Sequence, residues 1–403
     1  MKKNTKNIKN NYKEANLLEE ENLQKNDKNP VILENNLNKL KNNNYIGKVS
    51  AFDEYVFFNL RYSKFLELTN RLSNQTFLLI ERENQFLLSQ ILSQKDLSIY
   101  EDENKIKAII THNEDITSTE RDIYTSREYK LKILGSIINN EFTKEINFYP
   151  TRLDNILFFD NFDIILDYFN KKVLKNSSIY SKIKIGKLKN GHTKTNSDLE
   201  IYFNGFILLL NIEPKFIINL FSTLNKSFLI FTTNRDFALK ISNYNKTKLI
   251  DLNSLNLNTL NKNEQFEFFN HKSFNLVFLY DTIFNFDSVN IIKLLLEQFI
   301  KIDSEFGLYL DDDINYFEDK FLAKNIFFRQ FINRLNNKLF IYKTTSLDKF
   351  SINLLTKVNY IISKDISLND VEKISNSFSL INSYSCIGYE INNGELVLRF
   401  DLD

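Results

Sequence analysis

The clearest pattern of hydrophobic and polar positions lies in the middle of the chain. Residues 206–212 form an almost uninterrupted apolar run, which is typical of a strand buried on both faces. Pro214 follows, and apolar residues then recur at helical spacing, so the pattern predicts an amphipathic helix over 213–225. Apolar runs at 228–231 and 249–252 read as two more strands, with a second helix between them. Strand, helix, strand, helix and strand in this order predict a parallel sheet with covering helices.

The same alternation continues to the C-terminus. Strands are expected at 274–280, 308–310, 338–342, 360–362 and 395–400. Helices are expected at 289–302, 318–335 and 368–378. This pattern predicts an α/β domain over 173–403, with a doubly wound, mostly parallel sheet in a flavodoxin-like α/β/α sandwich. A helical insertion is expected around 285–336.

The N-terminal part of the chain has a different pattern. Residues 1–44 are Asn/Lys-rich and have little to bury, which predicts a disordered tail or a flexible arm. Residues 45–172 mix helical spacing at 58–72 and 86–92 with a strand pattern at 75–80, so we expect an α+β extension.

Composition limits the classes of function. The 403 residues include 52 basic and 51 acidic side chains, so any contact with nucleic acid must come from local patches. One cysteine excludes an internal disulfide framework and a cysteine-rich metal site, and the three histidines lie far apart. We therefore predict no metal and no cofactor. No apolar run is long enough to span a bilayer, so no membrane partner is expected. Abundant Asn, Lys, Ile and Phe with few Gly indicate an AT-rich genome.

The glycine-flanked stretch 186–193 has two interpretations. In the first, Gly186 and Gly191 followed by His192-Thr193 match the spacing of a phosphate-binding loop, except that histidine replaces the lysine. Residues 306–312 resemble the strand whose terminal acid holds magnesium, and Thr344-Thr345-Ser346 follow another strand as a sensor would. Together these motifs resemble FtsK/HerA-type motor ATPases. A neutral histidine cannot replace the permanent lysine cation, so this interpretation predicts a degenerate motor relative that has lost nucleotide binding.

In the second interpretation, the same stretch opens a ribosomal protein. The stretches that carry the resemblance are Ile185-Gly186, Gly191-His192-Thr193, Ile201-Tyr202, Gly205, Glu213-Pro214, Thr232-Thr233-Asn234-Arg235, Asn337–Ser346 and Val358–Asp365. They resemble the ribosomal protein S2 family in order and spacing over about half the chain. We favour this second interpretation, in which the chain is a divergent, enlarged mitochondrial member of that family.

The resemblance to ribosomal protein S2 implies a structural constituent of the mitochondrial small ribosomal subunit, which supports translation and is not an enzyme. Its partners would be ribosomal RNA and neighbouring ribosomal proteins, and its location the mitochondrial matrix, with the organelle genome as its source. Exposed basic side chains contact phosphates whatever the base sequence. The candidate RNA-binding residues are Lys182, Lys184, Lys187, Lys189, His192, Lys194 and Arg235.

Overall fold

The structure of the protein is a computed structural model. It describes residues 44–98, 125–174, 182–224, 226–243, 247–252, 275–280, 286–301, 306–311, 316–335, 338–348, 350–377, 388–393 and 396–402. The expected N-terminal tail up to residue 43 lies outside these ranges, as do His112, His271 and Cys386.

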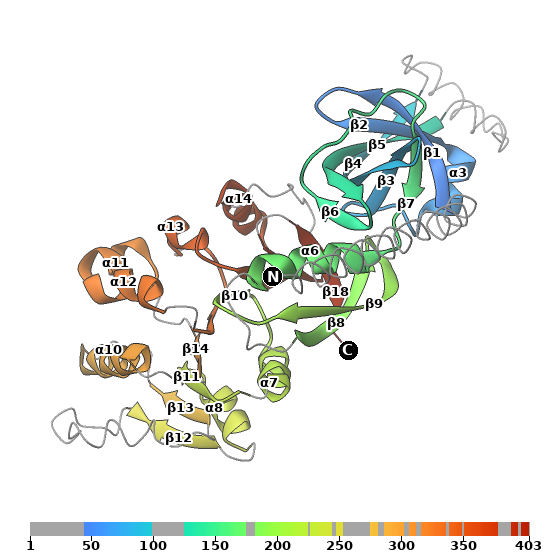
Figure 1. Cartoon of the computed structure of the whole chain (residues 1–403). Helices are drawn as coiled ribbons and strands as arrows, with labels where there is room; N and C mark the ends of the chain where they lie inside the picture. Colours follow the sequence, from blue (N-terminus) through green and yellow to red (C-terminus); the bar gives the residue numbers. More distant parts are fainter. Residues whose placement is uncertain are drawn as a thin grey trace, which may run out of the picture.

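The first part of the chain forms a closed antiparallel β-barrel (Figure 1). Its strands are β1 (Tyr45–Phe52), β2 (Val56–Arg61), β3 (Phe77–Arg82), β4 (Gln85–Ser98), β5 (Thr125–Ile138) and β7 (Asn155–Phe158). The pairing of β2 with β5 closes the barrel, and the short strand β6 (Glu141–Thr143) extends β5. One short helix, α3 (Tyr62–Leu68), follows β2.

Local sequence explains the barrel strands. On β2, Val56, Phe58 and Leu60 point inward and alternate with more exposed residues, as expected for a half-buried strand. Glu83-Asn84 and Asn139-Asn140 join neighbouring strands in tight hairpins, and all four residues have positive φ. The helical prediction for 86–92 is wrong, because these residues belong to β4 and pair with strands on both sides.

A second, mixed sheet follows the barrel. Its strands run in the order β12-β13-β11-β14-β15-β10-β16-β17-β18-β8-β9. The parallel part contains β10 (Phe206–Leu210), β11 (Phe228–Thr232), β12 (Thr247–Asp251), β13 (Asn275–Leu279), β14 (Gly307–Asp311), β15 (Phe340–Thr344) and β16 (Tyr360–Lys364). The antiparallel part contains β17 (Tyr389–Asn392), β18 (Val397–Asp401), β8 (Lys182–Asn190) and β9 (Thr193–Tyr202).

Helices cover both faces of this sheet. One face packs against α6 (Phe162–Leu174), α7 (Pro214–Thr223) and α8 (Arg235–Ser242). The other face packs against α10 (Phe286–Lys301), α11 (Asp319–Lys324), α12 (Ile326–Arg334), α13 (Ile352–Leu355) and α14 (Leu368–Ser377). The region 285–336, expected as an insertion, thus contains three of these helices and also the central strand β14.

The predicted fold class is wrong in two respects. The flavodoxin-like, doubly wound sheet is instead a mixed sheet with four antiparallel strands, and the α+β extension is a closed barrel. The physical reason lies in the glycine-flanked stretch 186–193, whose spacing matched a phosphate-binding loop but which belongs to a pair of antiparallel strands. Ile183, Ile185 and Leu188 are buried along β8, and the chain turns back at Gly191-His192 to form a hairpin.

The helix α6 links the two units. It lies between the barrel and the mixed sheet in the sequence, and it packs against β6 as well as β9. The buried Asn170 accepts a hydrogen bond from the Tyr202 N–H and donates one to the Glu200 carbonyl. Across the described ranges, no helix has the length and apolar character needed to cross a membrane.

Candidate functional site at the carboxyl edge of the parallel strands

The structure places the seven predicted RNA contacts in two regions. Lys182, Lys184, Lys187 and Lys189 lie on β8, His192 in the hairpin turn and Lys194 on β9. Arg235 is instead the first residue of α8, whose N-cap is Asn234. The hairpin therefore brings six of the residues together, and Arg235 belongs to a different part of the sheet.

Two aspartates neutralise most of the hairpin lysines. Asp198 lies 3.1 Å from the Lys184 Nζ and 3.5 Å from the Lys187 Nζ. The hydrogen bond from Lys184 is the main reason that the pKa of Asp198 lies below its ordinary value. Asp401 pairs with Lys189 at 3.1 Å and Lys194 at 3.0 Å.

The Asp401 carboxylate remains charged in this setting. Burial raises its pKa, but hydrogen bonds from Lys194 and Lys189 outweigh burial and hold the pKa below its ordinary value. These pairs compete with phosphate for the lysine side chains.

His192 does not act as a cation in the turn. Partial desolvation of its ring, followed by the nearby charges of Arg399 and Lys189, lowers its pKa. The imidazole is therefore neutral at pH 7, which removes the charge that a phosphate contact needs.

The glycine-flanked stretch contacts the barrel and is not available as a phosphate site. Gly191 has a φ of 62°, and a Cβ at this position would overlap the hydroxyls of Ser73 and Thr76 in the barrel. Next to it, the buried Asn190 side chain accepts from the Phe77 N–H at 2.7 Å and donates to the Phe159 carbonyl at 3.1 Å. Glycine is needed here for close contact with the barrel, so the spacing that matched a phosphate loop has a structural role.

A second group of polar residues lies where the parallel strands end. The strands β11, β14, β15, β10 and β16 are consecutive neighbours in the sheet, so their carboxyl ends line one edge. In open α/β sheets, ligands bind in the crevice outside such strand ends, where the strand order reverses. This edge is therefore the part of the fold in which a functional site is expected.

The connection from β10 to α7 is too short to surround a phosphate. Asn211, Ile212 and Glu213 are its only residues, since β10 ends at Leu210 and α7 begins at Pro214. The Asn211 N–H donates to the Thr344 carbonyl at 2.9 Å, and its side-chain amide donates to the Lys364 carbonyl at 3.0 Å. A phosphate-binding loop has its own turn of backbone amides before the helix, and here the Asn211 amide is already used.

The N-terminus of α7 carries a negative charge. Glu213 is the N-cap residue, and its carboxylate pairs with Lys364 at the end of the neighbouring strand β16. That hydrogen bond raises the pKa of Lys364. A carboxylate next to a helix N-terminus interacts favourably with the helix dipole, but it repels a phosphate group at the same position.

The acid at the end of β14 is paired with a lysine. Asp311 is 4% exposed, and Lys343 on β15 approaches it at 3.2 Å. The Thr232 hydroxyl at the end of β11 donates to the second carboxylate oxygen at 3.1 Å. Tyr280 donates to the Asp311 backbone carbonyl, so the strand end is fixed from several sides. A magnesium ion at this carboxylate would have to displace the Lys343 ammonium group.

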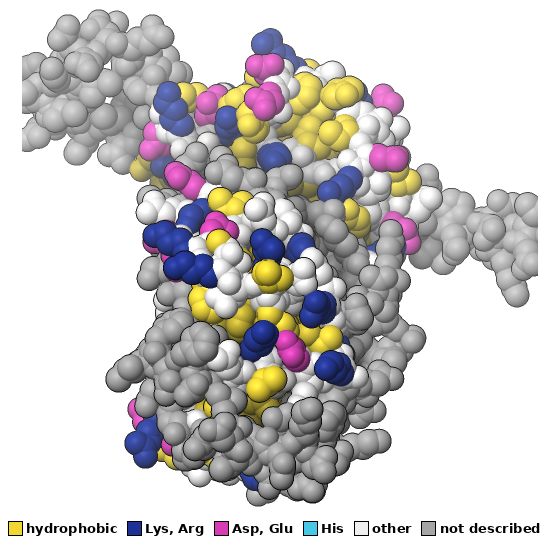
Figure 2. Space-filling view, turned by 90° about the vertical axis from the view of Figure 1, so that its left-hand side faces the viewer, with side chains coloured by type: hydrophobic (Ala, Val, Ile, Leu, Met, Phe, Trp, Pro, Cys, Tyr) yellow, Lys and Arg dark blue, Asp and Glu magenta, His cyan; other side chains and the backbone are white. Residues whose placement is uncertain are grey.

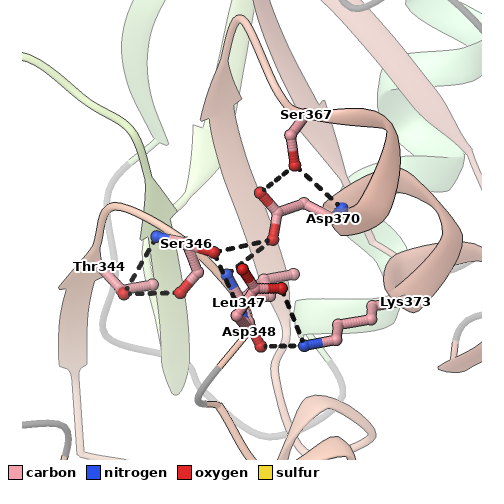
Figure 3. Close-up of polar contacts among 7 residues, drawn as sticks. All are labelled: Thr344, Ser346, Leu347, Asp348, Ser367, Asp370 and Lys373. Carbon is pink, nitrogen blue, oxygen red and sulfur yellow. Dashed lines mark hydrogen bonds and ion pairs between the residues drawn. The ribbon is translucent and has the colours of Figure 1, made fainter.

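Beyond β15, the polar residues bond to each other (Figure 3). The buried Asp370 accepts from the Leu347 N–H at 2.7 Å and from the Ser367 hydroxyl at 2.7 Å, which also places Ser367 to cap α14. Thr344 and Ser346 bond within the same turn. The proposed sensor segment is therefore held in a closed hydrogen-bond network.

The polar side chains at this edge stabilise the fold through ion pairs and hydrogen bonds within the chain. Asp311, Glu213 and Asp370 each have a cation or a hydrogen-bond donor, and no group of three or more His, Cys, Asp or Glu within the described residues is placed to hold a metal. Sequence reasoning identified Asp311 but missed Lys343, Glu213 and Asn211. The signal was present, because Glu213-Pro214 directly after an apolar strand leaves no room for a phosphate loop.

Comparison with known proteins adds distant structural similarities only. No protein-family model matches the sequence, and no curated protein matches it. The genome packaging NTPase B204 from Sulfolobus turreted icosahedral virus 2, in complex with AMP, is 12% identical with a TM-score of 0.33, over 48% of this chain and 95% of that chain. The DNA-packaging ATPase B204 from Sulfolobus turreted icosahedral virus is 12% identical with a TM-score of 0.35, over 50% of this chain and 98% of that chain.

Proposed function

We propose that this chain is a non-catalytic relative of P-loop motor proteins that works by binding macromolecular partners. The observation that carries the proposal is the three-residue connection between β10 and α7, next to an Asp311 that Lys343 neutralises. A motor of this class needs a phosphate loop, a magnesium acid and a sensor at neighbouring strand ends. In this chain, the ends of β10, β14 and β15 are neighbours, but side chains of the chain itself fill the places of phosphate and metal.

The proposal predicts that nucleotide binding can be restored at one position only. In a Lys343→Met background, an eight-residue phosphate loop of the G-x-x-x-x-G-K-T type would replace Asn211, Ile212 and Glu213. We expect this variant to bind ATP with magnesium, because the loop then lies beside an unpaired Asp311. Binding would be measured by calorimetry, after circular dichroism has established that the variant folds.

A matched control uses the other candidate loop. His192→Lys completes the phosphate-loop motif in the β8–β9 hairpin, yet we expect no ATP binding, because Gly191 packs against the barrel and no helix begins there. A folded loop replacement that binds no ATP, or an ATP-binding His192→Lys variant, would contradict the proposed relation to P-loop motors.

A role in an organellar small ribosomal subunit is a second proposal. It rests on the residues that resemble ribosomal protein S2, and on Lys182 and Arg235, which form no ion pair with a carboxylate in the described ranges. The test is a sucrose gradient of organelle lysate at high and low magnesium. Sedimentation with the small subunit at moderate salt would support the ribosomal role, and protein that stays at the top of the gradient would contradict it.

A further inference from the structure

Exposed basic side chains gather on the helices that follow β14. Figure 2 shows the side of the molecule that contains α10, α11 and α12, where Lys and Arg side chains are prominent and Asp and Glu are few. We call the outer surface of α11, α12 and the turn after α13 the helical basic face. Its exposed basic residues are Lys320, Lys324, Arg329, Arg334 and Lys357.

The helical basic face has a local charge excess that the whole chain lacks. Residues 316–335 and 350–358 contain these five basic side chains and two acidic ones, Glu318 and Asp319, whereas the chain has a net charge of +1. The core-facing positions of the same helices are apolar, with Leu322, Phe328 and Phe331 buried. The cations therefore lie on the side opposite the core.

Hydrogen bonds connect the elements of this face. Lys357 bonds to the Asn333 side chain on α12, and Arg334 donates to Gln330 at 2.9 Å one turn earlier. Within the ranges that the structure describes, none of the five cations forms an ion pair with a carboxylate, in contrast to the hairpin lysines that pair with Asp198 and Asp401. These five charges are thus available to an external anion.

The chemistry of the face favours a phosphate backbone. Protein interfaces are enriched in aromatic side chains and depleted in lysine, and single-strand binding sites stack bases on aromatic rings. Phe327, Phe328 and Phe331 are buried, so α12 presents no ring for either purpose. Apart from Ile326 at its first position, the exposed side chains of α12 are Arg, Gln and Asn, and these contact phosphate oxygens without reading bases.

We propose that the helical basic face binds the phosphate backbone of a double-stranded nucleic acid independently of base sequence. The inference goes beyond the proposed function and does not require a nucleotide site, since binding is measured without ATP. Arg329 and Arg334 provide planar guanidinium groups that match phosphate geometry.

The test is fluorescence anisotropy of the full chain with labelled duplexes of two unrelated sequences. The face variant carries Lys320→Gln, Lys324→Gln, Arg329→Gln and Arg334→Gln. The control variant loses the same charge through Lys184→Gln, Lys187→Gln, Lys189→Gln and Lys194→Gln. Because all four substituted side chains of the face are exposed, circular dichroism should show that the face variant keeps its fold.

We expect the face variant to lose roughly tenfold or more in affinity for both duplexes, and the magnitude of the salt slope to fall by about one for each phosphate contact removed. The control variant should bind within about twofold of the unmodified chain, because its lysines are already paired. Equal losses in both variants, no binding by the unmodified chain, or equal competition by polyglutamate would overturn the inference. The last result would indicate an acidic protein partner.

Discussion

Replacement of Lys343, the ion-pair partner of Asp311, tests whether this acid has a structural or a catalytic role. Lys343→Met removes the cation but keeps most of the volume of the side chain. The Asp311 side chain is 6% exposed and that of Lys343 is 14% exposed, so the substitution leaves a nearly buried carboxylate without its cation. Breaking a buried pair in this way costs about 3–5 kcal/mol. The Thr232 hydroxyl still donates to the carboxylate, so we expect a loss of about 3 kcal/mol, near the lower end.

A double-mutant cycle isolates the pair. Asp311→Asn with Lys343→Met removes both charges and keeps an acceptor for Thr232, so the double variant should recover about 2 kcal/mol of the loss, and the Asp311→Asn single variant completes the cycle that gives the coupling energy. The assay is urea unfolding followed by far-ultraviolet circular dichroism, since the chain has no tryptophan.

Lys364→Met is the matched control for Lys343→Met. Lys364 also ends a parallel strand and also pairs with a carboxylate, but its partner Glu213 is 53% exposed. Solvent screens this pair, so its loss should be clearly smaller than that of Lys343→Met. The reasoning is refuted if Lys343→Met unfolds at the same urea concentration as Lys364→Met.

Two further predictions concern the barrel. Gly191→Ala should destabilise the protein by about 1–2 kcal/mol through its left-handed backbone and by about 1–3 kcal/mol through overlap with the barrel. Gly388→Ala has no atom within 4 Å of the added carbon, so it should show the backbone cost alone. Urea unfolding compares the two variants. For Asp154, burial raises the pKa, but the Arg82 hydrogen bond and other contacts outweigh it, so the folded pKa lies below that of an unfolded aspartate. This carboxylate therefore stabilises the fold at pH values above its unfolded pKa, and its contribution is lost as the pH falls through the folded pKa. Unfolding curves from pH 7 downward should lose less stability in Asp154→Asn, and an unchanged pH dependence would contradict this assignment.

Sequence reasoning located elements well where the pattern was local. The strand at 206–212 is β10, which is buried throughout, and the next helix begins at Pro214 as predicted. The second helix expected between the runs at 228–231 and 249–252 is α8, which Asn234 caps. These features depend on neighbouring residues, so a single sequence contains the information.

Long-range pairing was not predictable in the same way. The expected single helix over 318–335 is two helices, because Asn325 adopts an extended backbone between them. The barrel closes through β2 and β5, whose sequence positions are far apart, and no local pattern specifies that contact. At the site, the spacing of Gly186 and Gly191 matched a phosphate loop, but Gly191 forms a positive-φ turn against the barrel and Gly186 packs closely against β18.

The proposed relation to P-loop motors requires that side chains of this chain occupy the position that a nucleotide takes in those proteins. Equilibrium dialysis of the full chain with labelled ATP and magnesium tests it most directly, with a dissociation constant in the range of 1 μM to 1 mM as the window for a functional site. The account predicts no saturable binding in this window. Saturable, magnesium-dependent binding that Asp311→Asn abolishes would contradict it, because Asp311 would then hold a metal and Lys343 would be a ligand of the phosphates.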